Sequence, residues 1–255
     1  MPGVNVVKNI LGRFFALYAL LLFALTMLLI ALPPVFICRL CIRDEKQRTA
    51  AIIKIFRLWI NVYLPLIFSP VSRRGTSHFR KGENYVVVCN HNALIDIPIS
   101  TPGVPGANKT LAKKELARIP VFGMVYRSGS ILVDRKNAQS RRQSIDKMKQ
   151  VLEQGMHLVL YPEGTRNKSA QPLKPFYDGA FNIAITMQKP IMPAIIFHTK
   201  KILPPHKPFF AWPHRIGLHF LEPVSTEGLT LADLPALKQH VFEMMEKYYV
   251  AGMNK

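Results

Sequence analysis

Residues 86–99 read VVVCNHNALIDIPI, and this stretch decides the fold that the sequence predicts. It begins with an apolar run that is typical of a buried strand. The run ends in Asn90, His91 and Asn92, and Asp96 follows among leucine, isoleucine and proline. Histidine and aspartate are seldom placed in a segment that is otherwise suited to burial. The arrangement therefore needs a structural or a chemical reason.

Short apolar runs alternate with amphipathic stretches from about residue 71 onward. Stripes of apolar residues at 140–154 and 234–248 predict helices that pack on the core by one face. Strands that alternate with helices predict an α/β fold with helices on both faces of the sheet. The apolar runs predict strands at residues 85–89, 131–133, 157–161, 191–196 and 216–221.

Two apolar segments precede this region. Residues 14–32 contain no charge, and as a helix they would be about 28 Å long, roughly the thickness of a bilayer's hydrocarbon core. A cleaved signal peptide is the alternative, but the run is too long and no small-residue cleavage site follows it. Residues 51–68 contain Lys54 and Arg57, whose charges can snorkel, so this segment is better interpreted as an interfacial helix or the return arm of a hairpin.

The sequence thus predicts two parts. We expect residues 1–70 to form a membrane-embedded or interfacial helical segment, either a membrane helix or a helical hairpin. We expect residues 71–255 to form the α/β domain. Basic residues crowd both the end of the first apolar segment and the entry to the α/β domain, so a shallow hairpin with both ends in the cytosol explains them as well as a single span does.

The charge balance narrows the class of partner. The 255 residues include 34 Lys and Arg against 15 Asp and Glu, a net charge of +19. Such an excess favours polyanionic partners, namely nucleic acid, anionic lipid, phosphorylated substrates or an acidic carrier protein. No nucleic-acid-binding motif accompanies the charge, and the apolar segments favour membrane lipids. The missing motif predicts no nucleic-acid partner. The histidines show no metal-ligand spacing such as His-Glu-x-x-His, so we also predict no metal site.

Polar residues follow two of the predicted strands, and in sheets of this class ligands collect where strands end. On a regular helix His91 and Asp96 would be about 140° apart and could not meet. They can meet if His91 lies in the loop after the strand and Asp96 in the first turn of the next helix. Asp96 would then accept the Nδ1 proton and leave Nε2 of His91 as a base. A core histidine satisfied by a carboxylate at a helix start remains the alternative.

The second strand end reads PEGTR, residues 162–166. Gly164 permits a close approach of the backbone to a ligand, and the planar guanidinium of Arg166 suits a phosphate group. A solvated arginine on a surface loop is the alternative for this motif taken alone.

Four short sequence blocks, at residues 90–96, 113–135, 161–166 and 189–196, resemble a known family when they are taken together, although any one of them would be a weak signal. In this order and spacing they resemble the glycerolipid acyltransferases with an H-x4-D motif, in particular the 1-acyl-sn-glycerol-3-phosphate acyltransferases. Two positions depart from the family pattern, Ala93 where Ser is usual and Asp178 where Lys is common. The blocks are NHNALID (90–96), KKELARIPVFGMVYRSGSILVDR (113–135), YPEGTR (161–166) and KPIMPAII (189–196).

The resemblance implies a mixed sheet flanked by helices, the glycerolipid acyltransferase fold, and an O-acyltransferase of phospholipid biosynthesis. A fatty acyl group would pass from an acyl thioester, on coenzyme A or acyl-carrier protein, to the sn-2 hydroxyl of 1-acyl-sn-glycerol 3-phosphate, giving phosphatidic acid. No other cofactor is implied. His91 would deprotonate the acceptor hydroxyl and Asp96 would orient the imidazole. The site would face the cytoplasm at a membrane, most simply the bacterial inner membrane.

The resemblance also implies a set of substrate contacts. Arg166 and Arg135 would bind the acceptor's phosphate, with Lys113 as a further cation. Glu163 would bond the glycerol part, the Gly164 backbone would help to hold the oxyanion, and Thr165 belongs to the same substrate-binding loop.

Three other functions remain open at this point. The protein could acylate a different lysolipid, it could be a non-catalytic membrane-anchored protein that binds anionic lipid, or it could be a hydrolase with water as the acceptor. The last is disfavoured because a phosphate-binding arginine pair has no evident use in hydrolysis.

Overall fold

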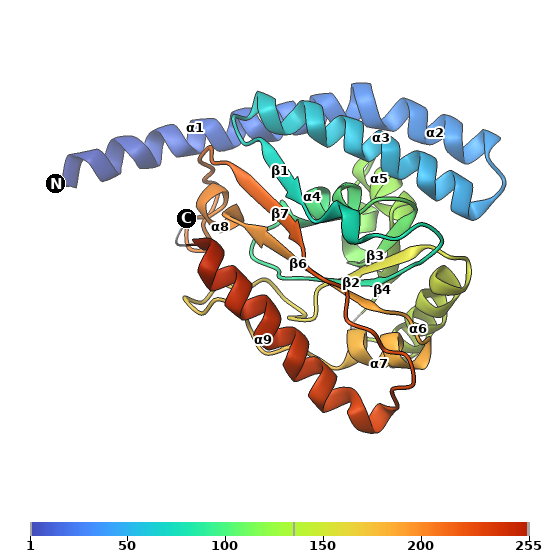
Figure 1. Ribbon diagram of the computed structural model, residues 1–255. Coiled ribbons are helices and arrows are strands. Elements are labelled where there is room, and N and C mark those ends of the chain that lie inside the picture. The colour runs from blue at the N-terminus through green and yellow to red at the C-terminus, as the bar shows by residue number, and fades with distance from the viewer. Residues whose placement is uncertain (1, 135, 254–255) are drawn as a thin grey trace.

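The computed structural model describes residues 2–134 and 136–253, and within them a sheet of seven strands forms the centre of the molecule (Figure 1). The strand order is β1-β7-β6-β2-β5-β3-β4. All neighbouring pairs are parallel except β6 and β7, which are antiparallel, so the predicted mixed sheet is confirmed. The strands are β1 (Val71–Arg74), β2 (Val86–Cys89), β3 (Asn108–Lys113), β4 (Ser130–Val133), β5 (His157–Leu160), β6 (Ile191–Phe197) and β7 (Ile216–Phe220).

The central strands are buried on both faces, which explains their continuous apolar sequences. Alternate residues of β2 point to opposite faces: Val87 and Cys89 join one hydrophobic cluster, and Val86 and Val88 join the other. The five strands predicted from the sequence are all present, but β1 and β3 were not predicted.

Helices cover both faces of the sheet, as predicted (Figure 1). One face carries α3, α4 and α5, with α1 and α2 outside α3, and the other carries α6, α7 and α9. A π-helical segment, Met27–Ala31, joins α1 to α2. The helices are α1 (Pro2–Thr26), α2 (Leu32–Cys41), α3 (Glu45–Leu66), α4 (Asp96–Gly103), α5 (Phe122–Ser128), α6 (Ala138–Glu153), α7 (Gly179–Thr186), α8 (Thr199–Ile202) and α9 (Leu234–Met253).

The N-terminal helices form a hairpin. Trp59 of α3 donates its indole N–H to the hydroxyl of Thr26 at 2.9 Å, and the hydroxyl of Tyr63 donates to the carbonyl of Ala19 at 3.2 Å. Phe23 of α1 packs against the rings of both Trp59 and Tyr63. Two helices, Val6–Cys41 and Glu45–Leu66, are long and apolar enough to cross a membrane. Their outward faces expose many large apolar side chains.

Helix α3 is also part of the core of the α/β region. Its inner face shares a hydrophobic cluster with β2 and α4. Arg57, whose charge could snorkel by the sequence, has protein partners in the structure. Its guanidinium donates to the carbonyls of Pro102 at 2.7 Å and Val104 at 2.9 Å, at the end of α4. Burial of that charge requires such partners, so α3 is tied to the helix that follows the His91 loop. The division of the chain at residue 70 stays a prediction.

Candidate active site

His91 lies in the loop between β2 and α4, at the carboxyl end of a central strand. Asp96 is the first residue of α4, which is the position that the sequence predicts. The side chain of Asn90 fixes the start of the loop, because it donates to the carbonyl of Ile196 in β6 at 3.0 Å and accepts the Ile196 N–H at 2.7 Å. The loop therefore leaves the sheet in one defined direction.

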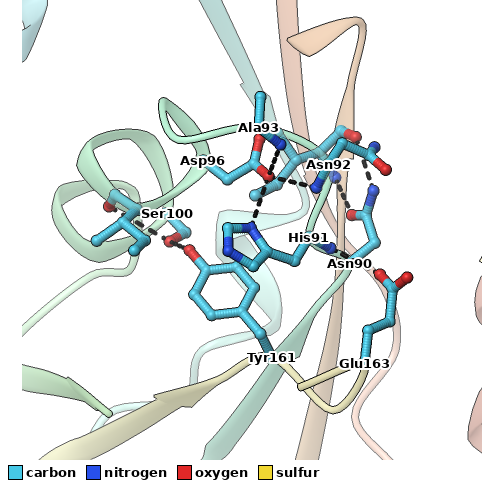
Figure 2. Close-up of polar contacts among 10 residues, drawn as sticks. Asn90, His91, Asn92, Ala93, Asp96, Ser100, Tyr161 and Glu163 are labelled. Carbon is cyan, nitrogen blue, oxygen red and sulfur yellow. Dashed lines mark hydrogen bonds and ion pairs between the residues drawn. The ribbon is translucent and has the colours of Figure 1, made fainter. Parts of the chain in front are cut away.

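The imidazole and the carboxylate meet (Figure 2). Nδ1 of His91 lies 2.9 Å from Oδ2 of Asp96, and the same oxygen accepts the backbone N–H of Asn92 at 2.5 Å and of Ala93 at 2.7 Å. The Asp96 side chain is fully buried, whereas that of His91 is 14% exposed. A carboxylate can only accept here, so the proton of neutral His91 is assigned to Nδ1 and Nε2 carries the lone pair.

The departure at residue 93 leaves this arrangement intact, since the contact to Asp96 comes from the backbone of Ala93. Asp178, the other departure, forms an ion pair with Lys238 of α9 at 2.6 Å. Neither departure removes a group that holds the His91–Asp96 pair.

Glu163 braces the loop from the neighbouring strand end. Its Oε1 accepts the N–H of His91 at 2.7 Å, and its Oε2 accepts the N–H of Lys174 at 3.0 Å. The residue is fully buried. Burial raises the pKa of the Glu163 carboxyl above its ordinary value, and the two backbone bonds oppose that rise. The structure thus gives this carboxylate a role in holding the backbone of His91, and the expected contact to the acceptor's glycerol stays a prediction.

The rest of the PEGTR loop surrounds this brace. Gly164 has φ +68°, and a Cβ there would lie 2.7 Å from the ring of Tyr177, so a side chain is excluded. The hydroxyl of Thr165 accepts a hydrogen bond from the ammonium of Lys174 at 2.6 Å. Arg166 is exposed and lines a cavity. The next residue, Asn167, donates its N–H to the carbonyl of His91 at 2.6 Å, which joins the two strand ends.

Lys113 ends β3 at the same edge of the sheet, because β3 runs parallel to β5 and β4. Its side chain is exposed, and its ammonium lies 3.4 Å from a carboxylate oxygen of Glu115. Arg135 lies outside the described residues. It follows β4 by two positions, and β4 ends at Val133, which is paired with Lys113.

A largely apolar cavity of about 990 Å³ adjoins the loop. It is lined by residues of α1, α3, α4 and α5, by the residues just before α4 and by residues 202–205 and 207–211. Asn92, the neighbour of His91, lines it together with Arg166 and Lys168. A polar site with cationic side chains thus opens into space that suits a hydrocarbon chain.

Two further cations near the site were not predicted from the sequence. Lys174 and Lys200 lie on segments that carry no recognisable motif, and the ammonium of Lys200 donates to the carbonyl of Ser169 at 3.0 Å. Burial lowers the pKa of Lys200, while the charges of Glu163 and Asp96 oppose that change. Only the folded chain shows that these lysines approach the two carboxylates.

The described residues contain no group of three or more His, Cys, Asp or Glu side chains that could hold a metal ion. The groups that the site does bring together are a histidine base, a buried carboxylate that orients it and nearby cations.

Comparisons with known proteins agree with this geometry. Residues 71–197 match the profile of the acyltransferase family. The 1-acyl-sn-glycerol-3-phosphate acyltransferase alpha of Mus musculus is 33% identical over 202 residues, covering 78% of this chain and 70% of the mouse protein. The 1-acyl-sn-glycerol-3-phosphate acyltransferase of Helicobacter pylori is 32% identical over 166 residues, covering 65% of this chain and 68% of the bacterial protein.

A solved structure shows the same fold. The crystal structure of the 1-acyl-sn-glycerophosphate acyltransferase PlsC from Thermotoga maritima matches with a TM-score of 0.76 at 22% identity, covering 98% of each chain. This match includes the N-terminal helices as well as the sheet. By its similarity to the mouse and bacterial relatives, the chain belongs to the 1-acyl-sn-glycerol-3-phosphate acyltransferase family and is an O-acyltransferase.

Proposed function

We propose that the protein transfers a fatty acyl group from an acyl thioester to the sn-2 hydroxyl of 1-acyl-sn-glycerol 3-phosphate and so makes phosphatidic acid. The observation that carries the proposal is the bond between Nδ1 of His91 and the buried Asp96, in a loop that adjoins an apolar cavity lined by Arg166. The names of the relatives support the choice of acceptor.

The reaction needs one proton carrier. Nε2 of His91 takes the proton of the acceptor hydroxyl while that oxygen attacks the thioester carbonyl. The tetrahedral intermediate then collapses, the carbon–sulfur bond breaks, and the imidazolium returns the proton to the leaving thiolate. Asp96 stabilises the imidazolium between these steps. A positioned base contributes about 10²–10⁴ in rate, and no covalent acyl-enzyme and no further cofactor is required.

Cations select the acceptor. Arg166 binds the phosphate of the acceptor by a charge-assisted bond, with Arg135 and Lys113 as the other predicted phosphate ligands. The acyl chains occupy the apolar cavity, where each buried methylene contributes about 0.8 kcal/mol. The Gly164 backbone and Thr165 remain predicted contacts of the reacting ester and the headgroup.

The membrane setting follows from the exposed apolar faces of α1 and α2. We propose that the helical hairpin inserts shallowly from the cytoplasmic side, the bacterial inner membrane being the simplest setting. Basic residues lie both at the hairpin's turn and at its base, and a hairpin that lies along the membrane surface keeps both sets of charges outside the hydrocarbon core. A lysophospholipid already in the bilayer surface would then reach the site directly.

An activity matrix tests the proposal. Purified protein in phospholipid vesicles is given acyl-coenzyme A or acyl-acyl-carrier protein, each with lysophosphatidic acid, lysophosphatidylcholine or no lysolipid. The expected result is phosphatidic acid from at least one donor, lost in His91→Ala. The matrix also includes 1-monoacylglycerol, which lacks the phosphate, and a rate with it equal to that with lysophosphatidic acid would contradict the arginine assignments. Free fatty acid as the main product would indicate a hydrolase, and wild-type function in His91→Ala would indicate a non-catalytic protein.

A further inference from the structure

Tyr161 lies directly against the proposed base. It follows β5, and its ring centroid is 4.4 Å from that of the His91 imidazole, with the ring planes inclined by 34°. Figure 2 shows the ring beside the imidazole, with the tyrosine hydroxyl directed to Ser100 of α4. The two hydroxyl oxygens are 2.6 Å apart. The sequence motif gave this residue no role beyond its place at a strand end.

Helix α4 holds both rings from one face. Asp96 and Ser100 are four residues apart, so they point the same way from the helix. Asp96 binds the edge of the imidazole at Nδ1, and Ser100 binds the hydroxyl of Tyr161. The side chains of Asp96, His91, Tyr161 and Ser100 therefore form a closed chain of contacts. The imidazole is held at an edge by a carboxylate and at a face by an aromatic ring.

We propose that Tyr161 is a positioning residue for His91, and that its ring stabilises the imidazolium that forms when His91 has taken the proton. This rests on the function proposed above. The face of an aromatic ring attracts a cation because the ring's quadrupole places negative charge on that face. The attraction exists only in the protonated state of the base, so it acts in the transition state and not in the resting enzyme.

The hydroxyl of Tyr161 sets the orientation of the ring. Burial raises the pKa of this hydroxyl well above its ordinary value, so it stays neutral and serves as a hydrogen-bonding group. A phenyl ring would fill the same space without a polar atom to satisfy. The bond to Ser100 satisfies the partly buried hydroxyl of Tyr161. The same bond prevents the tyrosine ring from turning away from the imidazole.

Other groups around the pair affect its protonation and must stay constant in any test. They come from every element that packs on the site. They are Cys89 of β2, Asp96 of α4, Glu163 and Lys174 of the loops after β5, Lys200 of α8 and Tyr249 of α9.

Aromatic substitution at position 161 isolates the ring's electrostatic effect. Tyr161→Phe is compared with the same protein carrying pentafluorophenylalanine at position 161, which keeps the shape but reverses the charge distribution of the ring. The measurement is kcat/KM for lysophosphatidic acid as a function of pH in phospholipid vesicles. Because the ring stabilises imidazolium, loss of the ring's attraction lowers the pKa of the base. The acidic limb of the kcat/KM profile then shifts to lower pH by about half a unit.

The apparent pKa of the base is therefore expected to be higher in Tyr161→Phe than in the fluorinated protein. The value in Ser100→Ala is expected to lie between those of wild type and Tyr161→Phe, or to equal one of them. Tyr161→Leu, where it folds, has an apparent pKa between those of Tyr161→Phe and the fluorinated protein. Identical acidic limbs for the phenyl and fluorinated rings would overturn the proposal and leave the ring as packing alone. His91→Ala is measured beside them. Retained activity in His91→Ala would refute the proposed function. If His91→Ala is inactive but the acidic limbs of the Tyr161 variants do not shift, only the role of Tyr161 is refuted.

Discussion

Replacing Asp96 with asparagine removes one charge from the site and keeps the size of the side chain. Oδ2 of Asp96 accepts three N–H donors, from His91, Asn92 and Ala93. The other oxygen, Oδ1, is buried and has no hydrogen-bond partner among the described residues. Asparagine can keep the three bonds only by placing its NH₂ group at the buried Oδ1 position.

The opposite orientation of the amide is also unfavourable. The NH₂ group would then face three N–H donors, and His91 could bind it only through an unprotonated Nδ1. The proton of the imidazole would move to Nε2, and the base would be lost. In either orientation the imidazolium loses its anionic partner.

The size of the effect follows from these contacts. A hydrogen bond to a charged group is worth about 1.5–3 kcal/mol and a neutral one about 0.5–1.5 kcal/mol. Exchanging the charged acceptor of the imidazole N–H for a neutral one therefore lowers the rate roughly tenfold. The wrong tautomer removes a base worth about 10²–10⁴ in rate. We expect kcat to fall at least about a hundredfold, with KM for lysophosphatidic acid little changed, because Asp96 does not contact the acceptor.

The assay follows thiol release from an acyl thioester at varied lysophosphatidic acid, with circular dichroism as a check on folding. Asp146→Asn, at an exposed position of α6, is the matched control and keeps the wild-type kcat. A folded Asp96→Asn enzyme with kcat within threefold of wild type would refute the reasoning, because the imidazole would then work without its carboxylate.

Arg166→Ala is expected to raise KM for lysophosphatidic acid about tenfold or more, the value of a charge-assisted bond, while Arg142→Ala on the exposed face of α6 leaves KM unchanged; equal KM values in both variants would contradict the phosphate assignment. Burial lowers the pKa of His157 from 6.5 to about 4, so the unfolded chain binds the extra proton and folding stability is lost as pH falls from 6.5 towards 4, by at most roughly 3 kcal/mol. Urea unfolding of wild type and His157→Gln across that range checks this, and parallel pH dependences would count against it. Replacing Leu21, Leu25 and Leu29, which are 61%, 52% and 68% exposed, with glutamine should reduce partition into phospholipid vesicles at least about tenfold, since each buried leucine contributes about 1.5–3 kcal/mol. Ile145→Gln on α6 is the control for that measurement, and unchanged partition of the triple variant would exclude this face from the membrane contact.

The strands that the sequence predicted include those that the fold buries most completely, and also β4, which alternates between more and less buried positions. β2, β5 and β6 are buried at every position, so their apolar runs stand out. β1 reads VSRR and β3 reads NKTLAK, and both alternate between more and less buried positions. β1 also pairs with a strand that is distant in sequence, since Val71 is paired with Ile216. Such strands are defined by their neighbours and carry little local signal.

The same distinction applies to the site. His91, Asp96 and Arg166 were predicted because they belong to short motifs with a known geometry. Ser100 and Tyr161 are 61 residues apart, and only the arrangement of α4 beside β5 brings their hydroxyls together. The buried brace of Glu163 to the His91 backbone likewise depends on neighbouring strands, because it joins residues 72 positions apart.

Arg57 shows a further limit of sequence patterns. In an apolar segment its charge suggests a position near lipid headgroups. In the structure its guanidinium closes the end of α4 through the carbonyls of Pro102 and Val104. Hydropathy cannot distinguish a lipid headgroup from a backbone carbonyl as the partner of Arg57, because either one satisfies a charge at the edge of an apolar surface.

The most direct test of the central claim is the single-turnover rate of acyl transfer to lysophosphatidic acid in His91→Ala. His240→Ala, at an exposed position of α9, is the matched control. With folding intact, the His91 variant is expected to lose at least about a hundredfold in rate while the His240 variant keeps the wild-type rate. A His91→Ala enzyme that transfers the acyl group within tenfold of the wild-type rate would show that a different group removes the proton.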